Sequence, residues 1–241
     1  DLHVRSRRQR QMCIRDREQN ERQKLFVGAV THELKTPLTS LLLNVNTLRN
    51  VYLPEEKQEA LLTSMDAQLH WLETMVRKLL TLLSMKKNAK IAPVSVPELL
   101  TQVRELTRPI MEKYGTSLEI TCNGDILPVD KDLMCIALVN LVENSAKASA
   151  PGQTIRIQAS EMGFTVTDHG RGIPEKDLQR VTDPFYMDDP SRSKANGGFG
   201  LGLALVREIA AVHGGTLVLE STLGEGTTAR IVIGNQTVTC R

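Results

Sequence analysis

Apolar residues recur at alternating steps of three and four along residues 20–88, a spacing that predicts two long helices. The break between them, at residues 50–54, is short enough to fold the helices antiparallel. A second apolar stripe makes the face too wide for one partner helix, so we expect two hairpins to pair as a homodimeric four-helix bundle. The main stripe holds Val27, Val30, Leu34, Pro37, Leu41 and Leu48, then Leu62, Met65, Leu69, Leu72, Val76, Leu79 and Leu83.

The pattern changes after residue 90, where short strand-like and helix-like segments alternate. This order predicts an α+β two-layer sandwich over residues 93–235. Residues 170–198 are rich in Gly, Pro, Asp and Ser and are expected to form mostly a loop. The expected strands are 93–96, 117–122, 154–159, 163–167 and a final pair joined by a turn at 224–226; the expected helices are 97–114, 131–149 and 201–213.

The first hairpin helix carries a candidate nucleophile in the segment FVGAVTHELKTPLTSL, residues 26–41. His32 stands beside the carboxylate of Glu33, and Thr36 follows one helical turn later. A carboxylate that accepts the proton of one imidazole nitrogen makes the other nitrogen a better nucleophile. Pro37 lacks an amide proton, so we expect the helix to bend just past the histidine.

Three further motifs indicate a nucleotide site in the sandwich. In NLVENSAK, Asn140, Asn144 and Lys147 line one helix face, and an amide oxygen suits Mg²⁺ while a lysine suits phosphate. In DHGRG, Asp168 lies at the end of a strand, and its carboxylate can accept a hydrogen bond from the amino group of adenine. GGFGLGL, residues 197–203, opens a helix, where glycines and free amides can cradle phosphate. Neither a Walker nor a Rossmann pattern is present.

These four motifs, in this order and over residues 21–233, resemble the cytoplasmic core of a two-component sensor histidine kinase. The resemblance implies the ATP-binding fold shared with gyrase and heat-shock chaperones, with ATP and Mg²⁺ as cofactors. It also implies that His32 is phosphorylated with help from Glu33, that Thr36 serves a phosphatase activity, and that phosphate passes to an aspartate of a response regulator receiver domain. The implied ATP-binding residues are Asn140, Asn144 (the Mg²⁺ ligand), Lys147, Asp168, Gly170, Gly172, Tyr186, Arg192, Lys194, Gly198, Gly200, Leu201 and Gly202.

Some positions depart from the family pattern. Met187 replaces a phosphate-binding arginine of the lid, Phe199 stands where a small residue is commoner, and Lys78 occupies a position that is often acidic. The alternative is therefore a catalytically weak dimeric scaffold that binds a regulator. An ATPase of the wider fold is disfavoured, because Asn140 stands where the hydrolysing relatives carry a water-activating glutamate. Glu143, one residue before Asn144, lies about 100° from it around the helix, so it is a poor substitute.

Composition and charge narrow the class of protein. The 241 residues are 41% hydrophobic with a net charge of +2, which gives no overall case for nucleic-acid binding. Residues 1–19 form a basic arm that is equally compatible with a juxtamembrane segment and a linker. Because the chain lacks an initiator Met and the family has a sensor region, we expect a cytoplasmic fragment of a bacterial inner-membrane protein. The four cysteines form no metal or disulfide pattern. We therefore expect an arm at 1–19, a dimerisation and phosphotransfer domain at 20–88 and an ATP-binding domain at 93–235.

Overall fold

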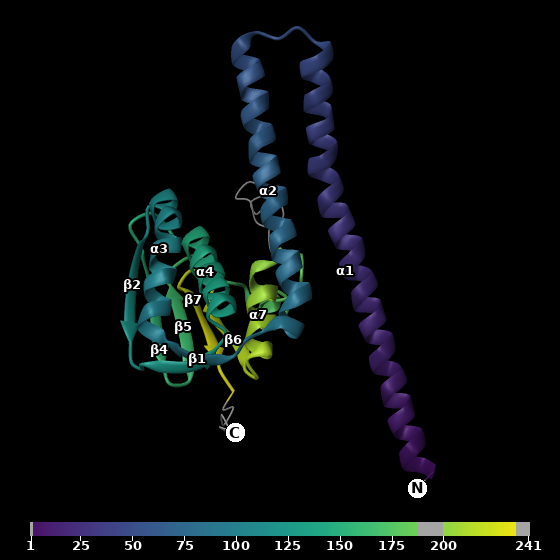
Figure 1. The fold of residues 1–241 in the computed structure, drawn as a ribbon, viewed down its shortest axis with the longest axis vertical. Coiled ribbons are helices and arrows are strands. Elements are labelled where there is room, and N and C mark those ends of the chain that lie inside the picture. The colour runs from purple at the N-terminus through teal and green to yellow at the C-terminus, as the bar shows by residue number, and fades with distance from the viewer. Residues whose placement is uncertain (1, 188–199, 235–241) are drawn as a thin grey trace. The chain divides into compact units, whose positions relative to one another are not determined.

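The computed structural model describes residues 2–187 and 200–234, with side chains from Phe26 onward. The chain divides into two compact units, Asp1–Val76 and Arg77–Arg241. The first unit is helical and the second contains the sheets (Figure 1). This division agrees with the expected multidomain organisation of a helical hairpin followed by a sandwich.

Two long helices form the hairpin. Helix α1 spans Leu2–Asn50 and helix α2 spans Glu55–Asn88, so the predicted break at 50–54 is confirmed. α1 begins well before residue 20, so the backbone of the expected arm is helical, and it continues as helix through Pro37. The amide Nε2 of Gln68 in α2 donates to Oγ of Ser40 in α1 over 3.0 Å, which joins the two helices.

The hairpin leaves part of its apolar stripe exposed. Alternate members of the α2 stripe, Leu62, Leu69 and Val76, are 46%, 52% and 43% exposed, and Leu38 and Leu42 of α1 are 50% and 65% exposed. These α2 positions lie seven residues apart, so they share one face of the helix. A single hairpin thus covers only part of its apolar surface, as the width of the stripe predicts.

The second unit is built on a five-stranded mixed sheet. Its order is β2-β4-β5-β7-β6, with β2 parallel to β4 and every other pair antiparallel. Helices α3, α4 and α7 pack on one face of this sheet, which makes the two layers (Figure 1). The strands are β2 (Ser117–Cys122), β4 (Thr154–Ser160), β5 (Gly163–Asp168), β6 (Thr216–Thr222) and β7 (Gly226–Val232); the helices are α3 (Val96–Tyr114), α4 (Lys131–Ala148) and α7 (Gly202–Val212).

Alternation along the strands explains the two-layer arrangement. In β4 the side chains of Ile155, Ile157 and Ala159 are buried, whereas the residues between them are exposed. Since successive side chains of a strand point to opposite faces, only one face of the sheet is covered. That covered face meets the apolar sides of the three helices, and their contact forms the core of the unit.

Two elements were not expected from the sequence. Strand β3 (Ile126–Val129) pairs antiparallel with β1 (Ala92–Ser95) in a separate small sheet. A one-turn helix, α5 (Glu175–Leu178), interrupts the segment expected to be loop. Residues 188–199 of that segment lie outside the described residues.

The last turns of α2 belong to the second unit. Met85 is 2% exposed and joins the core of the sandwich. Lys86 Nζ lies 2.9 Å from Oε2 of Glu208 in α7. Helix α2 therefore continues to Asn88, and its last turns pack within the second unit.

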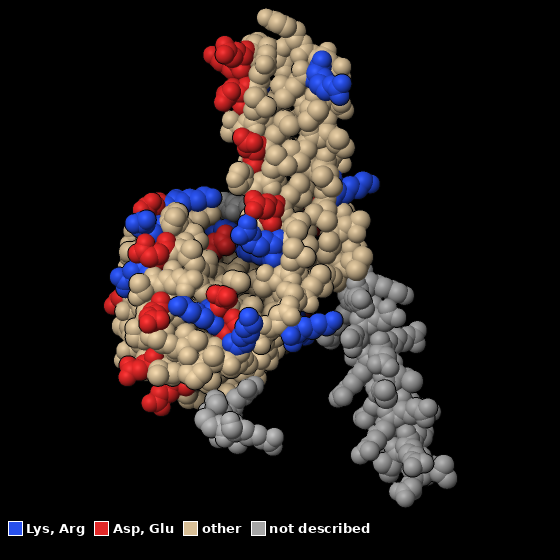
Figure 2. All heavy atoms as spheres, in the orientation of Figure 1, with Lys and Arg blue, Asp and Glu red and all other residues tan. Residues whose placement is uncertain are grey.

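Charged groups are mixed over the second unit. Figure 2 shows lysine and arginine side chains interspersed with acidic ones on the face turned to the viewer. Ion pairs such as Arg156–Glu119 and Arg230–Glu220 join neighbouring strands at 2.8 and 3.0 Å. The visible face thus carries no extended patch of a single sign.

Candidate functional site

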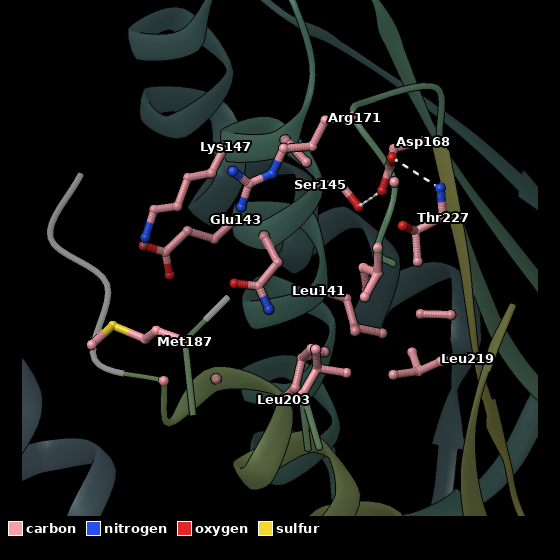
Figure 3. A pocket seen from close by; sticks show the side chains of 18 of the residues that line it. Leu141, Glu143, Ser145, Lys147, Asp168, Arg171, Met187, Leu203, Leu219 and Thr227 are labelled. Atoms are coloured by element: carbon pink, nitrogen blue, oxygen red, sulfur yellow. Dashed lines mark hydrogen bonds and ion pairs between the residues drawn. The ribbon is translucent and has the colours of Figure 1, made fainter. Parts of the chain in front are cut away.

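A pocket of about 370 Å³ opens in the second unit between α4, α7 and the sheet edge. Its charged and apolar linings are separated: Figure 3 shows Lys147, Glu143 and Arg171 at one end and Asp168 with Ser145 and Thr227 at the other. Apolar side chains lie between them. Apolar walls with a few placed polar groups are typical of a small-molecule site. The apolar lining comprises Leu141, Ile173, Val181, Leu203, Leu219 and Ala229.

Asp168 is the buried carboxylate of this pocket and is 4% exposed. Its Oδ2 accepts from the hydroxyl of Ser145 over 2.8 Å, and its Oδ1 accepts from the backbone N–H groups of Gly170 and Thr227 over 3.0 and 3.2 Å. These donors hold the carboxylate in one orientation at the end of β5. The geometry suits a fixed acceptor for an exocyclic amine.

At the opposite end one carboxylate holds two lysines. Glu143 Oε1 lies 2.7 Å from Nζ of Lys147, and Glu143 Oε2 lies 3.6 Å from Nζ of Lys78. Burial raises the pKa of Glu143, but the two ammonium charges and their hydrogen bonds outweigh this, so the pKa lies below its ordinary value. Burial lowers the pKa of Lys78, and the attraction to Glu143 offsets only part of that effect.

The two asparagines of the NLVENSAK motif have different surroundings. Asn140 is 5% exposed; its Nδ2 donates to the Ile136 carbonyl over 2.7 Å and its Oδ1 accepts from Lys78 over 2.8 Å. Asn144 lines the pocket, and no described residue hydrogen-bonds to its side chain. A Cβ on Gly202 would lie 3.3 Å from the side chains of both asparagines, so the start of α7 passes directly over them.

The glycines of the DHGRG motif serve backbone packing. A Cβ on Gly170 would lie 2.5 Å from the Ala148 carbonyl oxygen, and one on Gly172, where φ is +70°, would lie 2.1 Å from that of Thr222. The close neighbour of each glycine is thus the protein's own backbone, which gives both positions a packing reason to lack a side chain. Gly172 lines the pocket, whereas Gly170 is not one of its lining residues.

The rim near Tyr186 marks the base of the expected lid. The Tyr186 hydroxyl donates to Oδ1 of Asp177 over 2.6 Å, and the backbone N–H of Phe185 donates to the Gly200 carbonyl over 2.9 Å. Tyr186, Met187 and Gly200 line the pocket, whereas the side chain of Leu201 is fully buried. The predicted residues Arg192, Lys194 and Gly198, and also Phe199, lie outside the described residues.

His32 lies on α1 in the first unit, with its side chain 74% exposed. Its Nδ1 is 3.2 Å from Oε1 of Glu33, whose own side chain is 17% exposed. An ionised carboxylate only accepts, so this contact assigns the proton to Nδ1 and leaves the lone pair on Nε2. The Thr36 hydroxyl donates to the His32 carbonyl over 3.4 Å, as expected for residues one turn apart.

His213 lies at the end of α7 and is buried. A charged ring at a helix C-terminus would suit the helix dipole, but this ring is only 1% exposed. Nδ1 donates to the Ile209 carbonyl over 2.7 Å, while Nε2 accepts from the backbone N–H of Asp130 over 2.9 Å. A ring that donates from one nitrogen and accepts at the other is neutral.

Three charged residues line the pocket although the sequence motifs gave them no role in it. Glu143 and Arg171 each lie inside a motif, and Lys78 lies on a different element. Helical spacing could have indicated the contact of Glu143 with Lys147, because Glu143 lies one turn before the lysine. For Lys78 the chain contains no local signal, because its contact with Glu143 spans 65 positions.

Within the described ranges, no group of three or more His, Cys, Asp or Glu side chains could hold a metal ion. Mg²⁺ bound with a nucleotide does not require such a group, because phosphate oxygens and waters complete its shell. The available amide oxygen of Asn144 fits this role. In the same ranges, no helix has the length and apolar character needed to cross a membrane.

Family models match both units. Residues 22–88 match the His Kinase A (phospho-acceptor) domain, and residues 129–237 match the histidine kinase-, DNA gyrase B- and HSP90-like ATPase. The first match contains His32, and the second contains Asn144, Asp168 and Gly202. The helical hairpin and the mixed-sheet sandwich are thus the two domains that the motifs indicated.

Proteins of similar sequence are named as histidine kinases as well. The chain is 30% identical to the circadian input-output histidine kinase CikA of Synechococcus elongatus, over 88% of the chain and 30% of that protein. It is 33% identical to the histidine-protein kinase/phosphatase MprB of Mycolicibacterium vanbaalenii, over 87% of the chain and 45% of that protein. The chain therefore spans less than half the length of either relative.

Among solved structures, the histidine kinase AdeS of Acinetobacter baumannii shares the fold with a TM-score of 0.65 and 22% identity, over 85% of this chain and 98% of that one. A mycobacterial sensor histidine kinase MprB matches with a TM-score of 0.51 and 27% identity, over 60% of this chain and 97% of that one. Since both family models match in the order that the hairpin and the sandwich occupy, the chain belongs to the histidine kinases.

Proposed function

We propose that this chain transfers the γ-phosphoryl group of ATP to Nε2 of His32 and then to an aspartate of a response regulator. The observation that carries the proposal is the exposed His32 ring, whose Nδ1 faces the carboxylate of Glu33 at 3.2 Å. The ATP pocket of the second unit supplies the donor. Family membership supports both halves of the reaction.

The chemistry follows from the proton position. Nε2 attacks the γ-phosphorus, the bond from that phosphorus to the β–γ bridging oxygen breaks, and ADP leaves with the electron pair. The imidazole gains positive charge, and Glu33 accepts its Nδ1 proton. When a regulator carboxylate attacks the phosphorus, the N–P bond breaks and the proton returns to Nδ1.

In the pocket, we expect adenine to meet Asp168 and the phosphates to meet Lys147. Asn144 would hold Mg²⁺, which supplies positive charge against the phosphate oxygens. Lys147, Arg171 and the start of α7 at Gly202 lie at the pocket and would orient the polyphosphate. The remaining nucleotide-binding residues predicted from the motifs, Arg192, Lys194 and Gly198 included, keep their proposed roles.

Glu143 supports transfer over hydrolysis. It is the carboxylate nearest the expected phosphates, but its pKa is lowered by two lysines despite its burial. A general base works best with a pKa near the working pH, so Glu143 is a poor activator of water. Asn140, which stands at the water-activating position of the ATPase relatives, cannot accept a proton.

The hairpin supports a homodimer as the working form. Its exposed stripe, which includes Leu62, Leu69 and Leu42, resembles half of a helical bundle. We further propose that residues 20–88 are the dimerisation and phosphotransfer domain and 93–235 the ATP-binding domain. The basic arm at 1–19 fits the cytoplasmic side of a membrane-associated sensor.

The test is incorporation of label from γ-labelled ATP with Mg²⁺ into the wild type, His32→Gln and His70→Gln. His70 is the matched control, because it is an exposed histidine of the same hairpin whose Nδ1 faces only the Asp66 carbonyl, at 3.0 Å. Acid-labile, base-stable label should appear in the wild type and His70→Gln and vanish in His32→Gln. Equal label in all three proteins would refute the assignment of His32 as the phosphorylated residue.

A weakly catalytic scaffold is the second candidate, because the thioether of Met187 lines the pocket where the family pattern has a charged arginine. It predicts regulator binding without labelling. Binding of a purified receiver domain to a chain that takes up ATP but no label would favour it.

A further inference from the structure

A lysine from the second hairpin helix reaches the nucleotide pocket. Lys78 lies on the part of α2 that belongs to the second unit, and its side chain lines the pocket although only 17% of it is exposed. Its Nζ donates to Oδ1 of Asn140 over 2.8 Å and lies 3.6 Å from Oε2 of Glu143. The pocket is therefore lined by a residue from outside the domain that carries the nucleotide motifs.

Three cationic side chains gather at this end. Lys78, Lys147 and Arg171 all line it, and Glu143 pairs with both lysines. Asp168 is at the opposite end of the pocket (Figure 3). Partly buried charges are screened less by salt than exposed ones. This end therefore attracts a ligand with several negative charges.

Lys78 also orients a neighbour. The Asn140 amide donates to the Ile136 carbonyl over 2.7 Å and accepts from Lys78, so both ends of the amide are held. Asn140 in turn lies beneath Gly202, where α7 begins. Lys78 thus contacts Asn140, and the start of α7 packs against the same asparagine. This start of α7 is the part that is expected to face the phosphates.

The helix that carries Lys78 is anchored on the sandwich. Two turns further along α2, Met85 is buried in the core and Lys86 pairs with Glu208 at 2.9 Å. Lys78 is therefore held by its helix as well as by its own hydrogen bond.

We propose that Lys78 is a positioning residue for the polyphosphate of the nucleotide, so that tight ATP binding depends on α2 being in place against the second unit. This rests on the proposed function, since it assumes that ATP occupies the pocket. A cation near several phosphate oxygens stabilises a tri- or diphosphate and leaves the affinity for a nucleoside unchanged.

The experiment compares the affinities of the whole chain for ATP, ADP and adenosine by calorimetry at one Mg²⁺ concentration. The variants are Lys78→Met, Lys78→Arg and the matched control Lys87→Met, which removes an exposed lysine of the same helix that neither lines the pocket nor anchors the helix. Lys78→Met should weaken ATP binding by about tenfold, the effect of losing one charged hydrogen bond. ADP should show a smaller loss and adenosine none, and high salt should narrow the difference for ATP.

Lys78→Arg should retain most of the affinity, and Lys87→Met all of it. Equal losses for ATP and adenosine in Lys78→Met would overturn the inference, because they indicate a structural role alone. Tighter ATP binding in Lys78→Met would also overturn it, because the lysine would then block the site. If Lys78→Met fails to fold, Lys78→Gln replaces it under the same criteria. A wild type that binds adenosine and ATP equally well refutes the inference only, whereas a wild type that binds neither refutes the proposed function as well.

Discussion

The backbone N–H of Asp130 donates to Nε2 of His213 over 2.9 Å and so joins the start of α4 to the end of α7. Asp130 is also the N-cap of α4, where its Oδ1 accepts from the N–H of Leu133 over 3.0 Å, and its Oδ2 accepts from the N–H of Lys90 over 2.7 Å. One buried histidine therefore supports the cap of the helix that carries the asparagines.

His213→Leu should lower the free energy of unfolding of the second unit by about 2 kcal/mol, because it leaves the buried Asp130 N–H without an acceptor. Urea unfolding followed by circular dichroism measures the loss. His70→Leu, which alters an exposed histidine, is the control and should change stability by less than about 0.5 kcal/mol. Equal midpoints for the two variants would contradict a structural role for His213.

Gly172→Ala should destabilise the second unit more than Gly152→Ala. Both glycines have a positive φ, +70° and +87°, so each substitution costs about 1–2 kcal/mol of backbone strain. At Gly172 the new Cβ would also lie 2.1 Å from the Thr222 carbonyl oxygen, whereas at Gly152 nothing lies within 4 Å. Urea midpoints of the pair isolate the clash, and similar midpoints would show that the backbone at Thr222 yields easily.

Thr36→Ala should reduce dephosphorylation of the regulator by about tenfold or more while autophosphorylation persists, because a hydroxyl one turn after His32 can orient a water. Release of phosphate from a labelled receiver domain measures the first activity, and label on His32 measures the second. Thr39→Ala removes another hydroxyl of α1 that donates to a carbonyl four residues back, that of Lys35. It should leave both activities intact. A parallel fall in both activities of Thr36→Ala would argue for damage to the helix.

Glu143→Gln should change how stability depends on acid. Burial alone would raise the pKa of Glu143, but Lys78 and Lys147 lower it below its ordinary value of 4.5. The carboxylate therefore contributes stability that is present above pH 4.5 and is lost as the pH falls through the lowered folded-state value. The wild type should be more stable than Glu143→Gln at pH 7, and the two should converge in acid. The control Glu161→Gln, at an exposed position, should show the same dependence of the free energy of unfolding on pH as the wild type. A difference in stability between the wild type and Glu143→Gln that stays constant with pH would refute the pairing of Glu143 with the lysines.

Much of the fold could be predicted from periodicity and turn chemistry. The hairpin helices repeat apolar residues over many turns, so both helices and the break that ends at Pro54 could be predicted from this period. β3 was missed, although β1, which is equally short, was predicted at 93–96. A run of four residues carries too little period to identify a strand securely, and Ile126–Val129 is identified by its pairing with β1, 31 or more positions earlier.

The site was predicted where the chemistry is local in the chain. His32 and Thr36 are four residues apart with Glu33 next to the histidine, and Asn144 and Lys147 are three apart, so their spacing alone brought each set together on its helix. Local spacing does not reach His213. Its place at a helix end gives no sign of the hydrogen bond that its ring accepts from Asp130, 83 positions away.

The sequence by itself determined the two-domain fold and the family, and it put forward the candidate nucleophile with its carboxylate and the candidate nucleotide-binding residues, because each rests on short-range spacing along a helix or loop. Tertiary structure alone decided which charges meet. It placed Lys78 beside Glu143, it aimed the Asp168 carboxylate through donors from three segments, and it assigned the glycines of DHGRG to packing against Ala148 and Thr222. Those outcomes depend on contacts between distant segments, and a contact free energy is set by distance and burial, which no local pattern encodes.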